Sequence, residues 1–151
     1  MKKYMLGAIA LVVIDQIIKL IVVLKLKESI IIIPNFFELT YVKNFGISFS
    51  KLDGKIMLII LISIVLIGVI FYLMKYYLAN KYYMFGLTFM FAGAVGNFID
   101  RFFRGFVVDY LNFNIFNYDF PVFNFADMML VCGAIFLGII IFKEEMGKKH
   151  A

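Results

Sequence analysis

The sequence predicts a membrane protein of the all-α class: a bundle of four transmembrane helices with a small β-sheet lying on the membrane surface. Of the 151 residues, 64% are hydrophobic and only 17% are charged, so most of the chain must have lipid as its solvent. Four stretches approach the roughly 20 apolar residues that cross a bilayer. The tail beyond Phe142 is short and charged and leaves little room for an added domain, so we expect one integral membrane domain over residues 1–151.

The first predicted span, residues 4–24, carries Asp15 and Lys19 within apolar sequence. Each charge costs roughly 2.5–3.5 kcal/mol at mid-membrane, whereas each Leu, Ile or Val gains only about 0.3–0.6 kcal/mol. The two residues are four apart and therefore share one helix face. We expect them to pair with each other or with polar groups in the bundle interior.

A polar insert, residues 25–55, follows the first span. It contains Ser29 to Ile33, the turn residues Pro34 and Asn35, and then a β-branched and aromatic run over residues 36–44. This pattern is typical of short strands around a turn. It predicts a small sheet on the membrane surface.

Three further spans are predicted over residues 56–74, 82–99 and 125–142. The second has no charged residue, and Gly93 with Gly96 in the third permits close packing against a neighbouring helix. Residues 100–124 hold nine Phe or Tyr residues, which is typical of a segment at the level of the lipid headgroups.

The net charge of +5 comes largely from lysines at the ends of apolar runs. Such lysines bind anionic headgroups, so membrane lipids, and not nucleic acid, are the expected partners. An even number of spans places both termini on one side. Equal numbers of basic residues fall on the two sides, however, and the charge count leaves the orientation open.

The sequence offers no cluster of metal ligands. Its only cysteine, Cys132, lies within the last apolar run, and its only histidine, His150, lies in the charged tail. A histidine-based metal site or a Ser-His-Asp triad is therefore not expected. We expect no metal and no cofactor.

Polar residues in or near the membrane locate the candidate site, because they are costly there. They form five clusters, which are Asp15 to Lys19, Asn44 to Gly46, Gly93 to Arg101, Gly105 to Tyr110 and Phe123 to Asp127. The last three gather at one membrane face, because the third span ends and the fourth span begins on the same side of the membrane.

Asp109 and Asp127 are the candidate catalytic pair. A carboxylate among apolar residues resists ionisation, and two that lie close together share one proton. Such a pair supplies a base to activate water and an acid to protonate a leaving amine. The structural alternatives are helix capping by Asn124 or Asp127 and an ion pair with an arginine. Asp100 with Arg101 is interpreted as a structural ion pair.

The five clusters, in this order across four spans, resemble the lipoprotein signal peptidases, also called signal peptidase II, the bacterial aspartic proteases of the inner membrane. The most specific motifs are Gly-Asn-x-Ile-Asp-Arg at 96–101, Val-Val-Asp-Tyr at 107–110 and Phe-Asn-x-Ala-Asp at 123–127. The resemblance implies both termini in the cytoplasm, and the sheet and active site on the extracytoplasmic side.

The resemblance also implies the activity: cleavage of the signal peptide from diacylglyceryl-modified prolipoproteins, just before the lipid-bearing cysteine. The catalytic pair would be Asp109 and Asp127. Residues that match positions lining or supporting the active site are Asn44, Asn97, Arg101 and Asn124. Asp15 and Lys19 would either contact substrate or stabilise the bundle, and the protein is expected to act as a monomer.

Two other classes of protein remain as alternatives. One is a small membrane transporter or channel subunit, with Asp15, Lys19, Asp100 and Asp109 along an ion path. The other is a noncatalytic assembly protein that docks through its Phe-rich insert. Against both, the two aspartates fall at one face, whereas the second and fourth spans offer little deep polarity beyond Ser63 and Cys132.

Overall fold

The computed structural model describes residues 1–46 and 55–149. The described chain contains four long helices, which are α1 (Lys2–Lys25), α2 (Lys55–Tyr76), α3 (Lys81–Arg104) and α4 (Phe125–Lys149). Each is long and apolar enough to cross a membrane. They contain the four predicted spans and extend a few residues past them. The predicted tail position of His150 lies outside the described residues.

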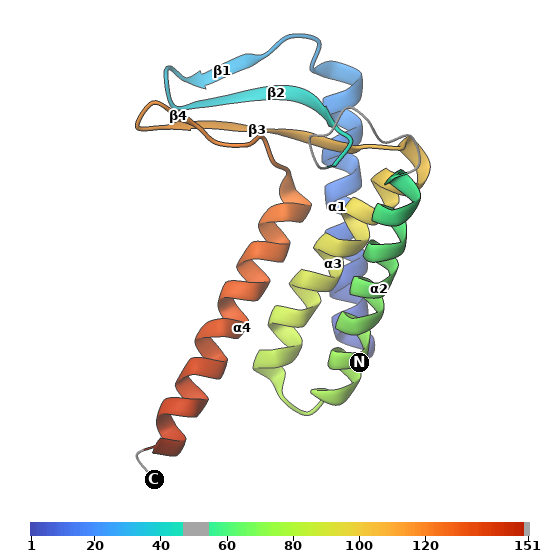
Figure 1. Ribbon diagram of the computed structural model, residues 1–151, viewed down its shortest axis with the longest axis vertical. Helices are drawn as coiled ribbons and strands as arrows, with labels where there is room; N and C mark the ends of the chain where they lie inside the picture. The colour runs from blue at the N-terminus through green and yellow to red at the C-terminus, as the bar shows by residue number, and fades with distance from the viewer. Residues whose placement is uncertain (47–54, 150–151) are drawn as a thin grey trace.

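Helix α3 is the centre of the bundle. Half of its membrane-crossing window is buried, against 22% or less in each of the other three helices, and it packs against all of them (Figure 1). Gly93 and Gly96 let α4 approach, as predicted: a Cβ on Gly93 would lie 2.3 Å from the carbonyl oxygen of Ala126. A helix enclosed by others can carry polar residues that would be costly against lipid, and its small residues let the neighbouring helices approach closely.

Local signals fix both ends of α3. The Asn80 side chain caps the start, accepting hydrogen bonds from the backbone N–H groups of Tyr82 at 3.0 Å and Tyr83 at 3.3 Å. Gly105 ends the helix with φ at +76°, a left-handed conformation that glycine adopts without a steric cost. The chain then turns directly into the strand that carries Asp109.

A four-stranded antiparallel sheet closes one end of the bundle. Its strands are β1 (Ile30–Ile33), β2 (Phe37–Asn44), β3 (Val107–Ile115) and β4 (Tyr118–Asp119), in the order β1-β2-β3-β4. The strands expected in the first insert are present. The second insert, predicted only as an aromatic interfacial segment, also contributes two strands, because β3 pairs with the otherwise open edge of β2.

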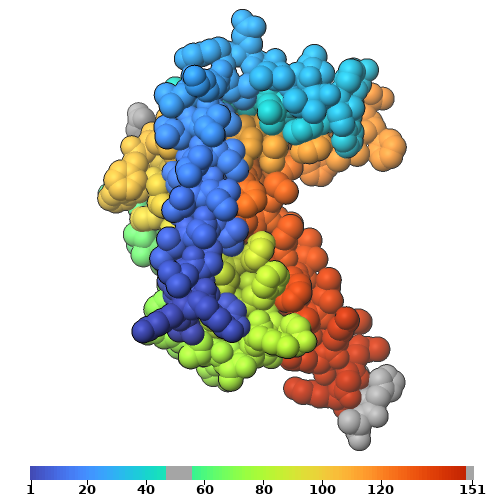
Figure 2. All heavy atoms as spheres, turned by 180° about the vertical axis from the view of Figure 1, so that it is seen from behind, coloured from blue at the N-terminus to red at the C-terminus, as the bar shows by residue number. Residues whose placement is uncertain are grey.

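The sheet is anchored on α1 and projects over α4. Val108 and Tyr110 of β3 pack with Val22 and Leu26 at the end of α1. From there the strands run outward above the start of α4, and both termini lie at the opposite end of the bundle (Figure 1). Figure 2 shows the sheet overhanging the upper part of α4.

Candidate active site

Strand pairing brings Asn44 to Asp109. In the β2–β3 ladder Val42 is opposite Asp109 and Asn44 is opposite Val107. Opposed residues share a face of the sheet, as do residues two apart on a strand, so Asn44 and Asp109 are diagonal neighbours. The Asn44 amide donates a 2.8 Å hydrogen bond to Asp109 Oδ2.

The first turn of α4 presents Asp127. The N-cap is Asn124, whose Oδ1 accepts the backbone N–H of Asp127 at 3.0 Å, while Asp127 Oδ2 accepts the backbone N–H of Asn124 at 3.2 Å. This reciprocal arrangement is a capping box. The capping role weighed as an alternative from sequence is therefore present, and it also fixes the orientation of the Asp127 carboxylate.

The two remaining N–H groups of this turn are bonded by distant residues. The Phe125 N–H donates to the Tyr110 hydroxyl oxygen at 3.2 Å, and the Ala126 N–H donates to Asp15 Oδ1 at 3.1 Å. Burial raises the pKa of Tyr110 to about 12, which keeps this hydroxyl neutral. Helix α4 thus begins at a fixed position relative to β3 and α1.

Two asparagines join the carboxylates of Asp109 and Asp127. Asn124 Nδ2 donates to Asp109 Oδ1 at 2.6 Å, and Asn97 Nδ2 donates to Asp127 Oδ1 at 2.7 Å. Asn124 Nδ2 also lies 3.3 Å from Asn97 Oδ1. Because Asn124 bonds to both aspartates, residues 18 positions apart in the sequence meet at one site.

The environment of Asp109 favours proton retention. Its side chain is buried in the protein. Burial raises the pKa of this carboxyl, the amides of Asn44 and Asn124 oppose that effect by bonding to the ionised form, and the charge of Asp127 adds to it. Asp127 itself is half-buried. One enclosed and one more accessible carboxylate suit a pair that shares a proton.

Arg101 does not pair with Asp100, contrary to the interpretation from sequence. Asp100 instead forms ion pairs with Lys19 at 3.0 Å and with Arg104. Arg104 is four residues from Asp100 and on the same helix face, whereas adjacent residues on a helix diverge. Arg101 is left to line the cavity that holds Asp127.

Asp15 and Lys19 form the expected pair inside the bundle. Lys19 Nζ lies 3.0 Å from Asp15 Oδ2, and both side chains are fully buried. Gln16, which sequence reasoning did not single out, bonds to Asp15 and to the carbonyl oxygen of Gly96, both at 3.1 Å. A glutamine beside a charged residue in an apolar run is the signal that would have identified it.

A cavity of about 480 Å³ opens beside Asp127 between α2, α3 and α4. Its polar lining consists of residues predicted for the site, together with Ser63. These polar residues are Asn44, Asn97, Arg101, Asp127 and Ser63. Its apolar wall includes Ile59, Ile62, Leu66 and Leu130.

A second groove, about 490 Å³ and almost entirely apolar, reaches Asp127 beneath the overhanging sheet. It is lined by Phe120, Pro121, Phe123, Asp127, Met128, Val131 and Cys132. Asp127 therefore stands between two openings. One carries polar groups and the other is apolar.

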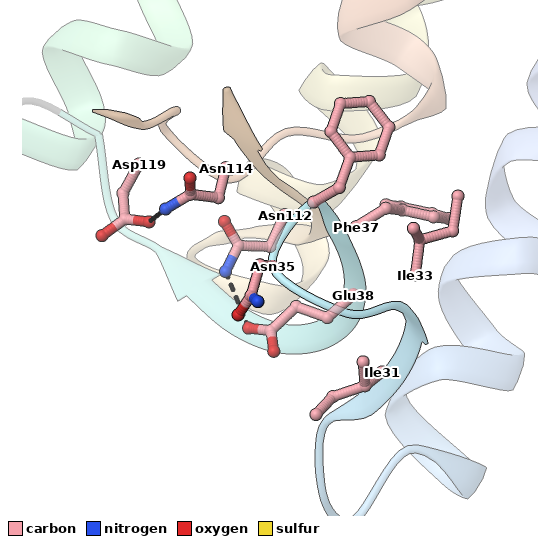
Figure 3. A pocket seen from close by; sticks show the side chains of 9 residues that line it. Ile31, Ile33, Asn35, Phe37, Glu38, Asn112, Asn114 and Asp119 are labelled. Carbon is pink, nitrogen blue, oxygen red and sulfur yellow. Dashed lines mark hydrogen bonds between the residues drawn. The ribbon is translucent and has the colours of Figure 1, made fainter. Parts of the chain in front are cut away.

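A smaller hollow of about 230 Å³ lies on the sheet itself (Figure 3). Its two carboxylates already accept amide hydrogen bonds, Glu38 from Asn112 at 2.8 Å and Asp119 from Asn114 at 2.6 Å. None of the predicted site residues lines it. The candidate active site is the region around Asp109 and Asp127.

No three His, Cys, Asp or Glu side chains are grouped for metal binding within residues 1–46 and 55–149. The carboxylates near the site are engaged by amide, ammonium or guanidinium groups. The carboxylates of such a set can perform acid/base chemistry, and the amides can orient them by hydrogen bonds.

Four membrane-crossing helices hold two carboxylates at one end of the bundle, where such a pair can act as acid and base. Comparison with known proteins identifies the class. The signal peptidase II family model matches residues 7–143. The chain belongs to the signal peptidase II family. It is thus a multi-pass aspartic endopeptidase of a bacterial membrane.

Individual relatives agree over nearly the whole length. The chain is 38% identical to the lipoprotein signal peptidase of Staphylococcus aureus strain JH9, covering 99% of this chain and 96% of that protein. A bacterial membrane enzyme solved by the in meso method at 2.3 Å resolution has a TM-score of 0.87 and 36% identity, covering 100% of this chain and 94% of the other. A second such enzyme, solved at 1.9 Å, has a TM-score of 0.82 and 34% identity, covering 95% and 94%.

Proposed function

We propose that this protein removes the signal peptide from diacylglyceryl-modified prolipoproteins, cutting just before the lipid-bearing cysteine, with Asp109 and Asp127 as the catalytic pair. The observation that carries the assignment is the shared partner Asn124. It donates to Asp109 at 2.6 Å and caps the helix turn that presents Asp127. The two carboxylates are therefore held together at one end of the bundle.

In the proposed reaction one carboxylate of the pair accepts a proton from water as the water attacks the scissile carbonyl. The other carries the shared proton and donates it to the leaving amine as the carbon–nitrogen bond breaks. The first carboxylate is then protonated and the second is ionised, and the proton passes back to the second carboxylate before the next turnover, which restores the pair. Asn97 and Asn124 orient the carboxylates, and Arg101 orients substrate within the cavity beside Asp127.

The two openings beside Asp127 suit the two apolar parts of such a substrate. We assign the diacylglyceryl chains to the apolar groove beneath the sheet, since Asp127 is the one charged residue among the described residues that line it. The signal-peptide segment then occupies the cavity between α2, α3 and α4, where Asn44 and Arg101 meet peptide groups. Lipid anchoring holds the scissile bond at the depth of the carboxylates.

The experiment that tests this function compares lipidated and unlipidated precursor with purified protein in detergent. We expect cleavage of the lipidated precursor and at most weak cleavage of the other. A liposome flux assay on the same protein tests the transporter alternative, for which no flux is expected. Equal turnover of the two precursors would contradict the proposed substrate class.

A further inference from the structure

Two buried carboxylates outside the proposed catalytic pair bond to the backbone immediately before it. Asp15 Oδ1 accepts the N–H of Ala126, the residue before Asp127, at 3.1 Å. Asp100 Oδ2 accepts the N–H of Val108, the residue before Asp109, also at 3.1 Å. Asp15 therefore holds the backbone next to Asp127, and Asp100 holds the backbone next to Asp109.

Lys19 connects these two carboxylates. Its Nζ lies 3.0 Å from Asp15 Oδ2 and 3.0 Å from Asp100 Oδ2. The third contact is with Asn97 Oδ1 at 3.1 Å. An ammonium group has three N–H donors, so all three are used. Asn97 in turn orients Asp127.

The cluster is balanced in charge and enclosed. Asp15, Lys19 and Asp100 are each fully buried, and Arg104, which is 25% exposed, supplies the second positive charge through Asp100. Gln16 accepts a hydrogen bond from Arg104 at 3.1 Å and so joins the guanidinium to the cluster. A buried ion network that is fully paired has few alternative arrangements, whereas removing one partner leaves an uncompensated charge.

We propose that Asp15, Lys19 and Asp100 are positioning residues for the reaction. One ammonium group holds two carboxylates, and these bind the backbone N–H groups of the residues that precede Asp127 and Asp109. The inference rests on the proposed function of that pair. It assigns to Asp15 and Lys19 a role in setting the separation of the catalytic carboxylates, and no contact with substrate.

Paired substitutions at each carboxylate isolate the hydrogen bond from the charge. Asp15→Asn and Asp100→Asn remove the charge but keep an oxygen that can accept the backbone N–H. Asp15→Leu and Asp100→Leu remove both at similar volume. Because a displacement of 1 Å costs on the order of 100-fold in rate, we expect kcat to fall about 100-fold in the Leu variants and clearly less in the Asn variants. KM stays near the wild-type value, since the bound substrate keeps its contacts.

A second test moves Asp15 without removing any polar group. A Cβ on Gly96 would lie 2.7 Å from Asp15 Oδ2, so Gly96→Ala must displace that carboxylate. Gly86→Ala is the matched control on the same helix, where the added Cβ would lie 2.6 Å from the Leu137 side chain. We expect Gly96→Ala to lower kcat about 10-fold or more with KM little changed, and Gly86→Ala to lower the melting temperature without lowering kcat.

The inference would be overturned if the Asn and Leu variants have equal kcat. It would also be overturned if Gly96→Ala and Gly86→Ala lose kcat equally at an assay temperature below all melting transitions. If the Leu variants do not fold, the comparison of Gly96→Ala with Gly86→Ala tests the inference. Asp109→Asn and Asp127→Asn are assayed alongside. If these two keep their activity, the proposed function itself fails; if they are inactive while the positioning variants keep wild-type kcat, only the inference fails.

Discussion

At the scale of single residues, Asn124 combines two roles that usually belong to different residues. Its backbone N–H and side-chain oxygen form the capping box with Asp127, while its side-chain nitrogen bonds to Asp109. Capping and catalysis were competing interpretations of this motif, and the structure contains the capping geometry within the candidate site. Loss of Asn124 would therefore weaken both the helix start and the carboxylate pair.

The Asn44 amide predicts a shift in the pH dependence of cleavage. Burial raises the pKa of Asp109, and the hydrogen bond from Asn44 to the ionised form opposes that rise. In Asn44→Ala the opposing bond is lost, so the pKa of Asp109 rises further. Because Asp109 is the member that favours retention of the shared proton, the pair keeps that proton to higher pH, and the basic limb of the kcat/KM profile should move upward.

Asn112→Ala is the control for this measurement, because Asn112 is an amide of the same sheet that bonds to Glu38 and not to the site. Its basic limb should match that of the wild type. A basic limb that stays in place or moves to lower pH in Asn44→Ala would contradict the electrostatic account of Asp109.

Residues of the candidate site could be identified from the sequence where the residues around them in the chain mark them out. Asp109 and Asp127 stand out as carboxylates among apolar residues, and Asp15 with Lys19 as an i, i+4 pair. Lys19 could not be identified as a partner of Asp100, because it is 81 positions away and meets Asp100 only after α1 and α3 pack, whereas the i, i+4 rule would have indicated Arg104. The structural ion-pair role expected for Asp100 is present, but Arg101 was the wrong partner, because adjacent residues on a helix point apart.

At the scale of elements, helices were predictable and half of the sheet was not. A membrane-crossing helix satisfies its own backbone hydrogen bonds, so about 20 apolar residues suffice to identify it. The strands β1 and β2 follow from a β-branched run around a turn. The strands β3 and β4 depend on pairing between segments far apart, such as Phe37 with Phe113, and the aromatic content of that insert indicated only its place at the interface.

The N-cap of α3 predicts a stability effect separate from activity. Asn80→Ala removes the side-chain acceptor for two N–H groups at the end of the bundle opposite the sheet. The loss of such a cap costs about 1 kcal/mol. We expect a lower melting temperature in detergent with kcat unchanged at temperatures below the transition. A large loss of kcat without a change in melting would contradict the separation of this cap from the site.

If the apolar groove on α4 binds the diacylglyceryl chains, a larger side chain within it should impair lipid binding. Val131 lines the groove, whereas Ile135, one turn further along α4 and similarly exposed, does not. Val131→Trp fills the groove and should lower kcat/KM for lipidated precursor about 10-fold or more, the effect of roughly 1.4 kcal/mol of lost binding. Ile135→Trp should retain the wild-type value. Equal effects of the two variants would contradict the assignment of the diacylglyceryl chains to this groove.

At the scale of the whole molecule, the sheet and the candidate site lie at one end of the bundle and both termini lie at the other (Figure 1). The basic residues do not decide which end faces the cytoplasm. We propose that the sheet is extracytoplasmic. The monomeric state expected from sequence stays a prediction.

Labelling with a membrane-impermeant maleimide tests this orientation in intact cells. In a Cys132→Ser background, which removes the only native cysteine, we introduce Phe116→Cys or Lys3→Cys. Phe116 is 99% exposed on the sheet, so its cysteine should react from outside, whereas the cysteine at position 3 should react only after the cells are opened. The reverse pattern would contradict the proposed orientation.

The central claim is that Asp109 and Asp127 act together as the acid and base. Asp109→Asn and Asp127→Asn each remove a titratable proton while keeping size and some hydrogen bonding. Each should therefore lower turnover by orders of magnitude with little change in membrane insertion. The most direct measurement is single-turnover cleavage of lipidated precursor by the two single variants and the double variant, with melting temperatures recorded for all three. We predict near-complete loss in each single variant and little further loss in the double, because residues that act as a unit are not additive; substantial turnover in either single variant would contradict the account.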